Sequence, residues 1–493
     1  MMAEALSKLR NEARESPSSS LAMGSAVVLA SGGVASLALW LQGPDNLMEA
    51  RAALAPWLLI DRFSLFFFVI LTLGAFLTVL LAGGYLPEHK LDRGEFYPLV
   101  LLSTAGAMAL AAAGDLLTMF IGLEVMSLGV YAMVAFRRGS PRSVEAAMKY
   151  FLLGSFAAAL LLYGGALLYG ATGKTDFSSI SFQLAHTGYA NPTNLQQLAW
   201  ENSTPLMVIG LILVVIGLAF KISAVPFHMW TPDAYEGAPT PATTFMAGAV
   251  KAGAFAMMIR VLMMAFGDVR SASWGSGWPP VLAALAVATM TVGNLIAGRQ
   301  ESVKRMLAYS SITHAGYMLV GVVAMAGTAR AEANGAVLFY TLIYTISTVG
   351  AFGALILCGS RGAEAVSYED LAGLGKRNPA VALALSLFIF SLAGIPPTAG
   401  FFAKLYLFKA AVSGDYIVLT VIALINTVIG AYYYLRVLVF MYFREPLPGA
   451  PIAKPMKSGH VAIALVFAAL LVLALGILPS KTLQAALSST ISG

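Results

Sequence analysis

The sequence predicts an all-α polytopic membrane protein, and three observations support this prediction. The 493 residues are 59% hydrophobic and only 11% charged, whereas roughly a quarter of the residues of a soluble domain are charged. Apolar stretches of about 20 residues, the length that crosses a bilayer as a helix, recur along the chain with short connections. Four of them contain a charge, at Glu124, Lys221, Lys251 and Lys404. A charge near the bilayer centre costs at least ~2.5–3.5 kcal/mol, so these four residues need a reason to be there.

Thirteen apolar stretches are long enough to span a membrane. In order, they cover residues 21–42, 62–84, 97–113, 115–135, 146–171, 205–230, 241–266, 280–298, 303–326, 334–358, 380–411, 416–442 and 460–480. The longest polar connection is 172–204. We therefore expect five regions: a cytoplasmic tail (1–20), N-terminal helices (21–96), two groups of five spans (97–266 and 280–442), and a C-terminal loop with the last helix (443–493).

The distribution of Lys and Arg predicts the orientation of these spans. If the N-terminus lies inside and successive connections alternate sides, most basic residues of the connections fall on the inner side, as the positive-inside rule requires. Thirteen spans then place the C-terminus outside. The excess of 30 Lys and Arg over 24 Asp and Glu therefore follows from topology and does not indicate a nucleic-acid partner.

Two of the stretches contain prolines that should break a helix. In the sixth stretch, Pro226 removes a backbone donor and crowds the preceding turn, so the helix should open beside Lys221. In the eleventh, two prolines flanked by glycines interrupt residues 391–400, and Lys404 follows within about two turns. Backbone carbonyls that are exposed at such breaks can hold water or a cation. Exposed backbone of this kind is tolerated in a membrane only where protein surrounds it.

The two groups of five spans are expected to be inverted repeats. The two broken stretches lie in corresponding positions of the groups, and in the predicted topology 205–230 runs inwards whereas 380–411 runs outwards. Inverted repeats with broken helices and charges near the midplane are a transporter architecture.

The residues in the spans suggest a relay of titratable groups that moves protons. Glu124, Lys221 and Lys251 lie deep in their spans, and Lys404 follows the second break. Burial disfavours charge on an amine and a nearby carboxylate favours it, so small movements can change the protonation of a buried lysine near Glu124. Moving one charge against 100 mV costs ~2.3 kcal/mol, which such changes can supply. The alternative is that these charges only lock helices together.

Other ionisable residues in the spans have two interpretations each. Lys149 is a candidate proton carrier, but it follows Glu145 by four residues, and such a pair near a helix end is a common stabilising device. His314 is either a buried structural histidine or a titratable ring between two lysine sites. Arg260 stays undecided between a functional and a structural role.

Several other chemistries find no support in the sequence. The single cysteine, Cys358, can form no internal disulfide, and the five histidines lack the spacing of a metal or haem site. No glycine-rich phosphate or dinucleotide loop follows a strand. If the protein is coupled to redox or ATP chemistry, that chemistry must therefore take place in a partner.

Five segments carry a resemblance to a known family. The run 221–241, KISAVPFHMWTPDAYEGAPTP, resembles the signature of the antiporter-like subunits of respiratory complex I. Four further segments narrow the resemblance, namely FMA at 245–247, KAGAFA at 251–256, VKRMLAYSSI at 303–312 and AGIPPTAGF at 393–401. Together they are most similar to the subunit N family of NADH-quinone oxidoreductase, over roughly residues 60–445.

The resemblance implies a role for each candidate residue. Glu124 and Lys221 resemble the Glu–Lys pair of the first half-channel, Lys251 the central relay lysine, and Lys404 the lysine of the second half-channel. Lys149 matches a lysine that also occurs in this subunit. Subunit M typically has glutamate where Lys404 stands, and the chain is too short after its last span for the lateral helix of subunit L.

The resemblance also implies the setting of the chain. It implies a proton-translocating, non-redox subunit in the bacterial inner membrane, among other antiporter-like subunits and lipid, with flavin, iron–sulfur clusters and quinone in partner subunits and no cofactor of its own. One departure is the number of spans. The family usually has fourteen, whereas thirteen are predicted here, and the missing one is the first. Two alternatives remain, a subunit of a cation/proton antiporter or membrane-bound hydrogenase, and a purely structural subunit.

Overall fold

The computed structural model describes residues 17–43, 52–187, 194–359, 364–446 and 456–491. Almost all of the predicted tail, 1–20, lies outside this part of the chain. The first half contains α2 (Pro17–Gln42), α4 (Arg62–Glu88), α5 (Phe96–Ala112), α6 (Leu116–Val134), α7 (Pro141–Thr172), α8 (Phe177–Thr187), α9 (Asn194–Ile222), α10 (Trp230–Gly237), α11 (Thr240–Phe245), η2 (Met246–Val250), α12 (Lys251–Arg260) and η3 (Val261–Ala265).

The second half is also helical. It contains α13 (Pro279–Ala297), α14 (Val303–Ala324), α15 (Arg330–Cys358), α16 (Tyr368–Leu371), α17 (Leu374–Arg377), α18 (Pro379–Ala393), α19 (Ala399–Ser413), α20 (Ile417–Phe443), α21 (Gly459–Ile477) and α22 (Ser480–Ser488). Apart from three isolated bridges, the described residues form no β-structure. The prediction of an all-α protein is confirmed.

The helices account for all thirteen predicted spans. Eleven helical segments in the described ranges are long and apolar enough to cross a membrane, and the shorter apolar helices α5 and α18 supply the other two. The connection 172–204 contains α8 and the start of α9. Helix α9 begins at Asn194 and continues through Pro205, so it is longer than the apolar stretch that revealed it.

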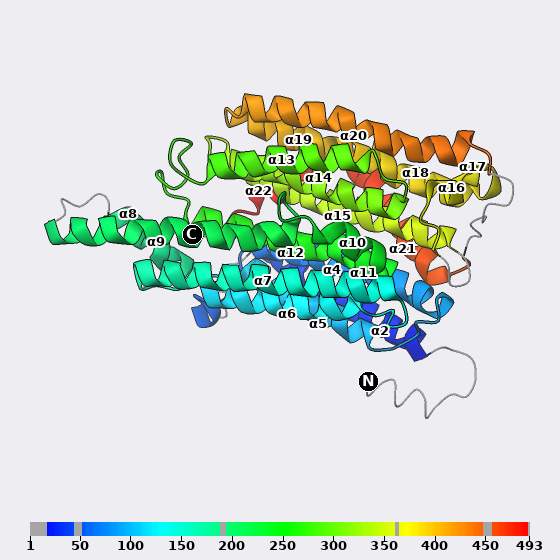
Figure 1. The fold of residues 1–493 in the computed structure, drawn as a ribbon, viewed down its shortest axis with the longest axis horizontal. Helices are drawn as coiled ribbons and strands as arrows, with labels where there is room; N and C mark the ends of the chain where they lie inside the picture. Colours follow the sequence, from blue (N-terminus) through cyan, green and yellow to red (C-terminus); the bar gives the residue numbers. More distant parts are fainter. Residues whose placement is uncertain (1–16, 44–51, 188–193, 360–363, 447–455, 492–493) are drawn as a thin grey trace.

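The core of the bundle is formed by α15 and by the continuous segment from α11 to η3. The most apolar windows of both are 100% buried, and that of α14 is 94% buried, whereas those of α2 and α21 are only 28% and 33% buried. Figure 1 shows α20 at one side of the bundle and α5, α6 and α7 at the other, with α14, α15 and α12 between them. Apolar side chains on the outer helices, such as Val428 of α20, are exposed and suit contact with lipid.

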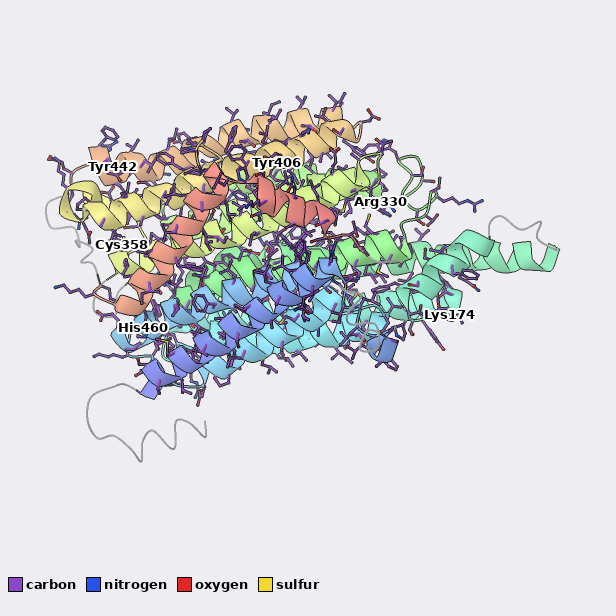
Figure 2. All side chains as sticks on the ribbon, turned by 180° about the vertical axis from the view of Figure 1, so that it is seen from behind. Lys174, Arg330, Cys358, Tyr406, Tyr442 and His460 are labelled. Carbon is purple, nitrogen blue, oxygen red and sulfur yellow. The ribbon has the colours of Figure 1, made fainter. Side chains whose placement is uncertain are left out.

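The connections gather at two ends of the bundle. Helices α16 and α17 lie at one end, and α8 lies at the other, where it projects beyond the bundle with the start of α9 (Figure 1). Seen from behind, Cys358, Tyr442 and His460 lie at the first end and Lys174 and Arg330 at the second (Figure 2). We call these the α16 end and the α8 end, and the sequence predicts that the α16 end faces the cytoplasm.

Both predicted helix breaks are present. Helix α9 ends at Ile222, and the freed N–H of Val225 donates to Thr289 Oγ1 of α13 at 3.0 Å. Helix α18 ends at Ala393, after which Gly394 adopts a left-handed φ of +84° that favours glycine. Helix α19 resumes at Ala399, and a Cβ on Gly400 would lie 1.8 Å from a backbone oxygen of α18. The second break therefore depends on glycine.

A polar contact joins the first and last helices at the α8 end. Trp40 Nε1 of α2 donates to Ser489 Oγ at 2.8 Å, and Asn334 Nδ2 of α15 donates to Ser489 O at 2.8 Å. Ser489 directly follows α22 and is fully buried. This serine therefore connects the two termini of the helical region with the central helix α15.

Candidate functional site

Four of the six candidate residues lie deep inside the bundle. Lys221 and Lys251 are each 1% exposed, His314 is 4% exposed and Lys404 is 7% exposed. They come from α9, α12, α14 and α19, so they link the two groups of five spans. Buried lysines away from carboxylates are costly in a membrane and indicate a functional site.

Lys221 lies in an aromatic pocket at the first helix break. Its Nζ donates to the hydroxyl of Tyr131 at 3.2 Å and stands 5.2–5.6 Å from the ring centres of Tyr131, Tyr150 and Phe220. Such contacts stabilise an ammonium ion without a carboxylate.

Glu124 and Lys221 do not form a direct ion pair within the described chain. Glu124 lies two turns from Tyr131 on α6, and its buried Oε1 has no hydrogen-bond partner among the described residues. The hydroxyl of Tyr131 contacts the amine instead. A buried carboxylate oxygen without a donor is costly, so this position suits a water molecule or a transferable proton.

Lys251 occupies the centre of the bundle and contacts a serine of the second group of spans. It is the first residue of α12 and directly follows the π-helical segment η2, a type of irregularity that is frequent at functional sites. Its Nζ donates to Ser311 O at 2.8 Å and lies 2.5 Å from Ser311 Oγ. Tyr344 donates its hydroxyl to the same Oγ at 2.7 Å. The amine is thus connected to two hydroxyl groups.

His314 lies one turn beyond Ser311 on α14 and is engaged on both sides of its ring. Its Nδ1 lies 2.7 Å from the Tyr340 hydroxyl, and its Nε2 lies 3.0 Å from the Tyr434 hydroxyl. A histidine held in this way can accept a proton at one nitrogen and release one at the other.

Lys404 contacts the second helix break directly. Its Nζ donates to Ala393 O, the last carbonyl of α18, at 2.8 Å, and lies 5.3 Å from the ring centre of Tyr317. Lys404 and His314 line one small cavity of about 10 Å³, which is close to the smallest volume that holds a water molecule. The lysine amine therefore contacts a carbonyl that the second break exposes.

Lys221, Lys251, His314 and Lys404 are called the buried row below. Lys149 lies apart from it. Its side chain is 44% exposed and pairs with Glu145 at 2.6 Å and with Asp233 at 2.9 Å. The i,i+4 pair with Glu145 is the structural alternative that the sequence offered. The second partner, Asp233 of α10, also binds Arg305 of α14 at 2.8 Å, so Lys149 belongs to a charge network that joins α7, α10 and α14.

Arg260 has a structural role in this fold. Its guanidinium binds both carboxylate oxygens of Asp61 at 3.0 and 3.1 Å, and its Nε donates to Ala111 O at 3.1 Å. Both side chains of the pair are almost completely buried, at 0% and 2% exposure. Asp61 also caps α4 through Ser64 N. Because the ion pair is fully satisfied, it fixes α12 against the start of α4.

A second buried charge cluster lies at the α16 end. Lys304 of α14 donates to Glu364 at 2.8 Å, and Arg137 lies 3.7 Å from the same carboxylate. The hydroxyls of Tyr85 and Thr240 also donate to Glu364. Burial by itself would raise the pKa of Glu364, but the Lys304 ammonium, the hydroxyl donor Tyr85 and the Arg137 guanidinium outweigh it and lower this pKa to about 2.

We expect Glu364→Gln to destabilise the protein at neutral pH by about 2 kcal/mol. The pKa of Glu364 in the fold lies below its ordinary value of 4.5. The carboxylate therefore stabilises the fold above that value, and this stabilisation is lost as the pH falls from about 5 towards 2. Thermal unfolding of the purified protein at pH 7 and pH 4 would show a lower midpoint for the variant at pH 7 and a smaller difference at pH 4.

Glu95→Gln is the matched control for this experiment. Glu95 pairs with Arg138 at 3.5 Å, but both side chains are more than half exposed, so its loss should change stability little. An equal decrease for both variants, or no dependence of the Glu364→Gln effect on pH, would contradict the assignment.

The chemistry of the buried row is that of proton carriers. Its members are amines and an imidazole, each of which is hydrogen-bonded to a hydroxyl or to a backbone carbonyl, and amines, imidazoles and hydroxyls exchange protons readily. Within the described ranges, no group of three or more His, Cys, Asp and Glu residues could hold a metal ion. The arrangement therefore fits transfer of protons between fixed groups.

Sequence analysis did not find the hydroxyl partners of this row. Tyr131, Tyr340, Tyr344 and Tyr434 contact candidate residues from other helices, and no spacing in the sequence relates them. One signal was available, because residues 310, 311 and 314 share one face of α14. Two serines and a histidine on one face of an apolar helix could have indicated that this face is polar.

Comparison with known proteins places the chain in a family. Residues 113–430 match the family model described as NADH:quinone oxidoreductase/Mrp antiporter, TM. The chain is 62% identical over its whole length to NADH-quinone oxidoreductase subunit N 1 of Sorangium cellulosum strain So ce56, of which it covers 95%.

Two solved structures have the same fold. A chain of respiratory complex I from Thermus thermophilus with bound aureothin is 34% identical, with a TM-score of 0.72, and the alignment covers 96% of this chain and 100% of that one. A chain of the Mrp complex from Dietzia sp. DQ12-45-1b is 24% identical, with a TM-score of 0.80, and the alignment covers 96% and 92%. The second likeness shows the fold alone.

These findings and the buried row define a multi-pass membrane protein of the antiporter-like class. The model match covers more than half of the chain, and the identity to a curated relative extends over all of it. The chain belongs to the NADH-quinone oxidoreductase subunit N family. The resemblance seen in the sequence is confirmed.

Proposed function

We propose that this chain is a proton-translocating membrane subunit of a redox-driven NADH-quinone oxidoreductase and that it carries protons through its buried row. The observation that supports this most strongly is that two buried titratable groups at the centre of the bundle each contact hydroxyls, Lys251 that of Ser311, and His314 those of Tyr340 and Tyr434. Family membership supports the assignment to the complex. Flavin, iron–sulfur clusters and quinone belong to partner subunits in this proposal, and this chain performs no redox step.

The proposed path has two halves that meet at Lys251. The first runs through Glu124 and Lys221, with Tyr131 between them, and the second runs through His314 to Lys404. Each half coincides with one of the proposed inverted repeats, 97–266 and 280–442, and contains one broken helix. A water molecule in the cavity shared by His314 and Lys404 would complete the second half.

We place Lys149 at the mouth of the path and the α16 end in the cytoplasm. The surface network around Lys149 contains Glu145 and Asp233, whose carboxylates can collect protons from water. The predominance of Lys and Arg in connections on the side of the N-terminus supports this orientation. The N-terminus then lies in the cytoplasm and the C-terminus in the periplasm.

We expect Lys221→Ala to abolish proton translocation while the complex still assembles. Within the described chain Lys221 forms no salt bridge, although the charge of Glu124 acts on it, and its amine donates to Tyr131. Its removal therefore takes away a proton carrier without breaking a direct ion pair. Proton uptake by inverted membrane vesicles during NADH oxidation, with assembly followed by co-purification, would measure both. Loss of about 100-fold is the scale of a lost acid–base group.

Lys376→Ala is the control, because Lys376 is 77% exposed in an ion pair at the α16 end. Unchanged proton stoichiometry in Lys221→Ala would favour the structural role of the buried charges. Co-purification with flavin and iron–sulfur subunits separates the proposed function from that of a cation/proton antiporter subunit, which would lack them.

A further inference from the structure

The two nitrogens of His314 contact hydroxyls that come from different helices. Nδ1 contacts Tyr340 of α15 at 2.7 Å, and Nε2 contacts Tyr434 of α20 at 3.0 Å. A neutral imidazole has one N–H donor and one acceptor nitrogen, so one tyrosine must donate to the ring and the other must accept from it. The protonation of His314 is therefore tied to the direction of both contacts.

The Tyr434 contact continues to a third group. The Tyr434 hydroxyl lies 2.5 Å from Ser310 Oγ, and Ser310 is one turn before His314 on α14. Ser310 and Tyr434 are each 2% exposed. Tyr434 thus contacts both His314 and Ser310, which are one turn apart on α14. The hydrogen-bonded chain therefore runs from His314 to Ser310, in the direction of Val303, the first residue of α14, which lies at the α16 end.

Tyr340 continues the chain on the other side of the ring. It is in the first half of α15, counted from Arg330 at the α8 end. His314 itself is near the middle of α14. The histidine therefore stands between a hydroxyl pair that leads towards the α16 end and a hydroxyl nearer the α8 end.

We propose that Tyr434 is a further proton-carrying residue, which connects His314 with Ser310 in the direction of the α16 end and makes His314 a branch point instead of a link in a single row. This inference rests on the proposed function. The row from Glu124 to Lys404 needs neither Tyr434 nor Ser310, so the branch is an addition to it.

The transfer is a sequence of proton hops without electron transfer. The Ser310 O–H bond breaks as its proton joins the Tyr434 oxygen, and the former Tyr434 proton forms a new N–H bond at Nε2 of His314. A hydronium ion that reaches Ser310 from the side of the α16 end returns a proton to it and becomes water. Both hydroxyls end neutral, and His314 becomes the imidazolium ion.

The neighbouring Tyr433 offers a matched control. It is equally buried, and its ring centre lies 4.5 Å from that of Tyr434. Its hydroxyl donates to Asn294 Oδ1 at 2.9 Å, and the Asn294 amide donates to Asn426. This contact holds α13 and α20 together. Tyr433 also has a side-chain hydrogen bond with Tyr434, but among the described residues it has none with the histidine ring, so it lies beside the proposed path and not in it. Replacing Tyr433 by Phe therefore removes a buried hydroxyl of the same kind from the same helix.

The experiment compares the variants Tyr434→Phe and Tyr433→Phe in the assembled complex. The measured quantity is the number of protons translocated per NADH oxidised. We expect Tyr434→Phe to lower this ratio at least about tenfold at unchanged assembly, as for loss of a proton-transfer group, and Tyr433→Phe to leave it within about twofold. Ser310→Ala should reproduce the Tyr434→Phe loss. The double variant should lose no more than either single one, because the two hydroxyls act in series.

Normal translocation in Tyr434→Phe, beside loss in Lys221→Ala, would overturn the branch and leave the proposed function standing. Normal translocation in both would overturn the proposed function itself. Equal losses in Tyr434→Phe and Tyr433→Phe, or additive losses in the double variant, would mean that packing is responsible and would also overturn the branch. If Tyr434→Phe fails to assemble, Ser310→Ala, which removes one oxygen, decides the question.

Discussion

Lys251→Met will reduce proton translocation by at least about 100-fold and leave the stability of the protein unchanged or higher. Methionine has about the volume of the lysine side chain but carries no proton. It also removes a buried charge that no carboxylate within the described residues balances. Replacing buried charges by apolar groups of similar volume is often neutral or stabilising. The measurement is proton uptake per NADH oxidised, together with the midpoint of thermal unfolding.

The combination of the two readouts separates a carrier from a structural lock. If Lys251 only held α12 against Ser311, its replacement would lower the stability of the protein. The proton translocation per assembled complex would then stay unchanged. Lys409→Met is the matched control, because Lys409 lies on α19 with an exposed side chain. A variant of Lys251 that is less stable but pumps normally would refute the relay at its central residue.

Asp61→Asn will destabilise the fold by about 3–5 kcal/mol, the cost of leaving one charge of a buried pair uncompensated. Asparagine keeps the size of the side chain and an oxygen that can cap α4, so the change isolates the lost charge. Arg260 would then remain fully buried with its two contacts to Asp61 weakened. Thermal unfolding of the purified complex and the amount of assembled protein in membranes would measure the effect.

The double variant Asp61→Asn with Arg260→Met tests this explanation. Removing the second charge should recover most of the stability, because no buried charge is then unpaired. Glu95→Gln again serves as the exposed comparison, with little expected change. A double variant that is less stable than Asp61→Asn alone would show that the pair contributes through packing and not through charge balance.

The sequence predicted the spans and the breaks well, because both follow from local properties. Hydropathy marks a span by length alone, and Pro226 and the two prolines after Gly394 act on the turns next to them. Burial of Lys221, Lys251 and Lys404 followed from their depth in those spans. The departures lie at helix ends such as the start of α9, where polar residues continue a helix beyond its apolar stretch.

The partners of the buried groups could not be predicted from the sequence. Asp61 and Arg260 meet although they are far apart in the chain, and the same holds for Tyr131 with Lys221 and for Tyr434 with His314. Such pairs depend on how helices rotate and pack, and apolar helices with little amphipathic pattern do not reveal which face meets which neighbour. Glu124 illustrates this, because its depth was clear but the lack of a direct ion pair with Lys221 among the described residues was not.

The contact of Ser489 with Trp40 has a consequence for the biogenesis of the protein. Trp40 and Ser489 lie 449 residues apart in the chain. Helix α2 can pack on α4 soon after both are synthesised, but its indole must wait in the bilayer until Ser489 has been synthesised before it finds this acceptor. All the helices that the structure describes, from α2 to α22, precede Ser489 in the chain, so this contact forms only after they have been made.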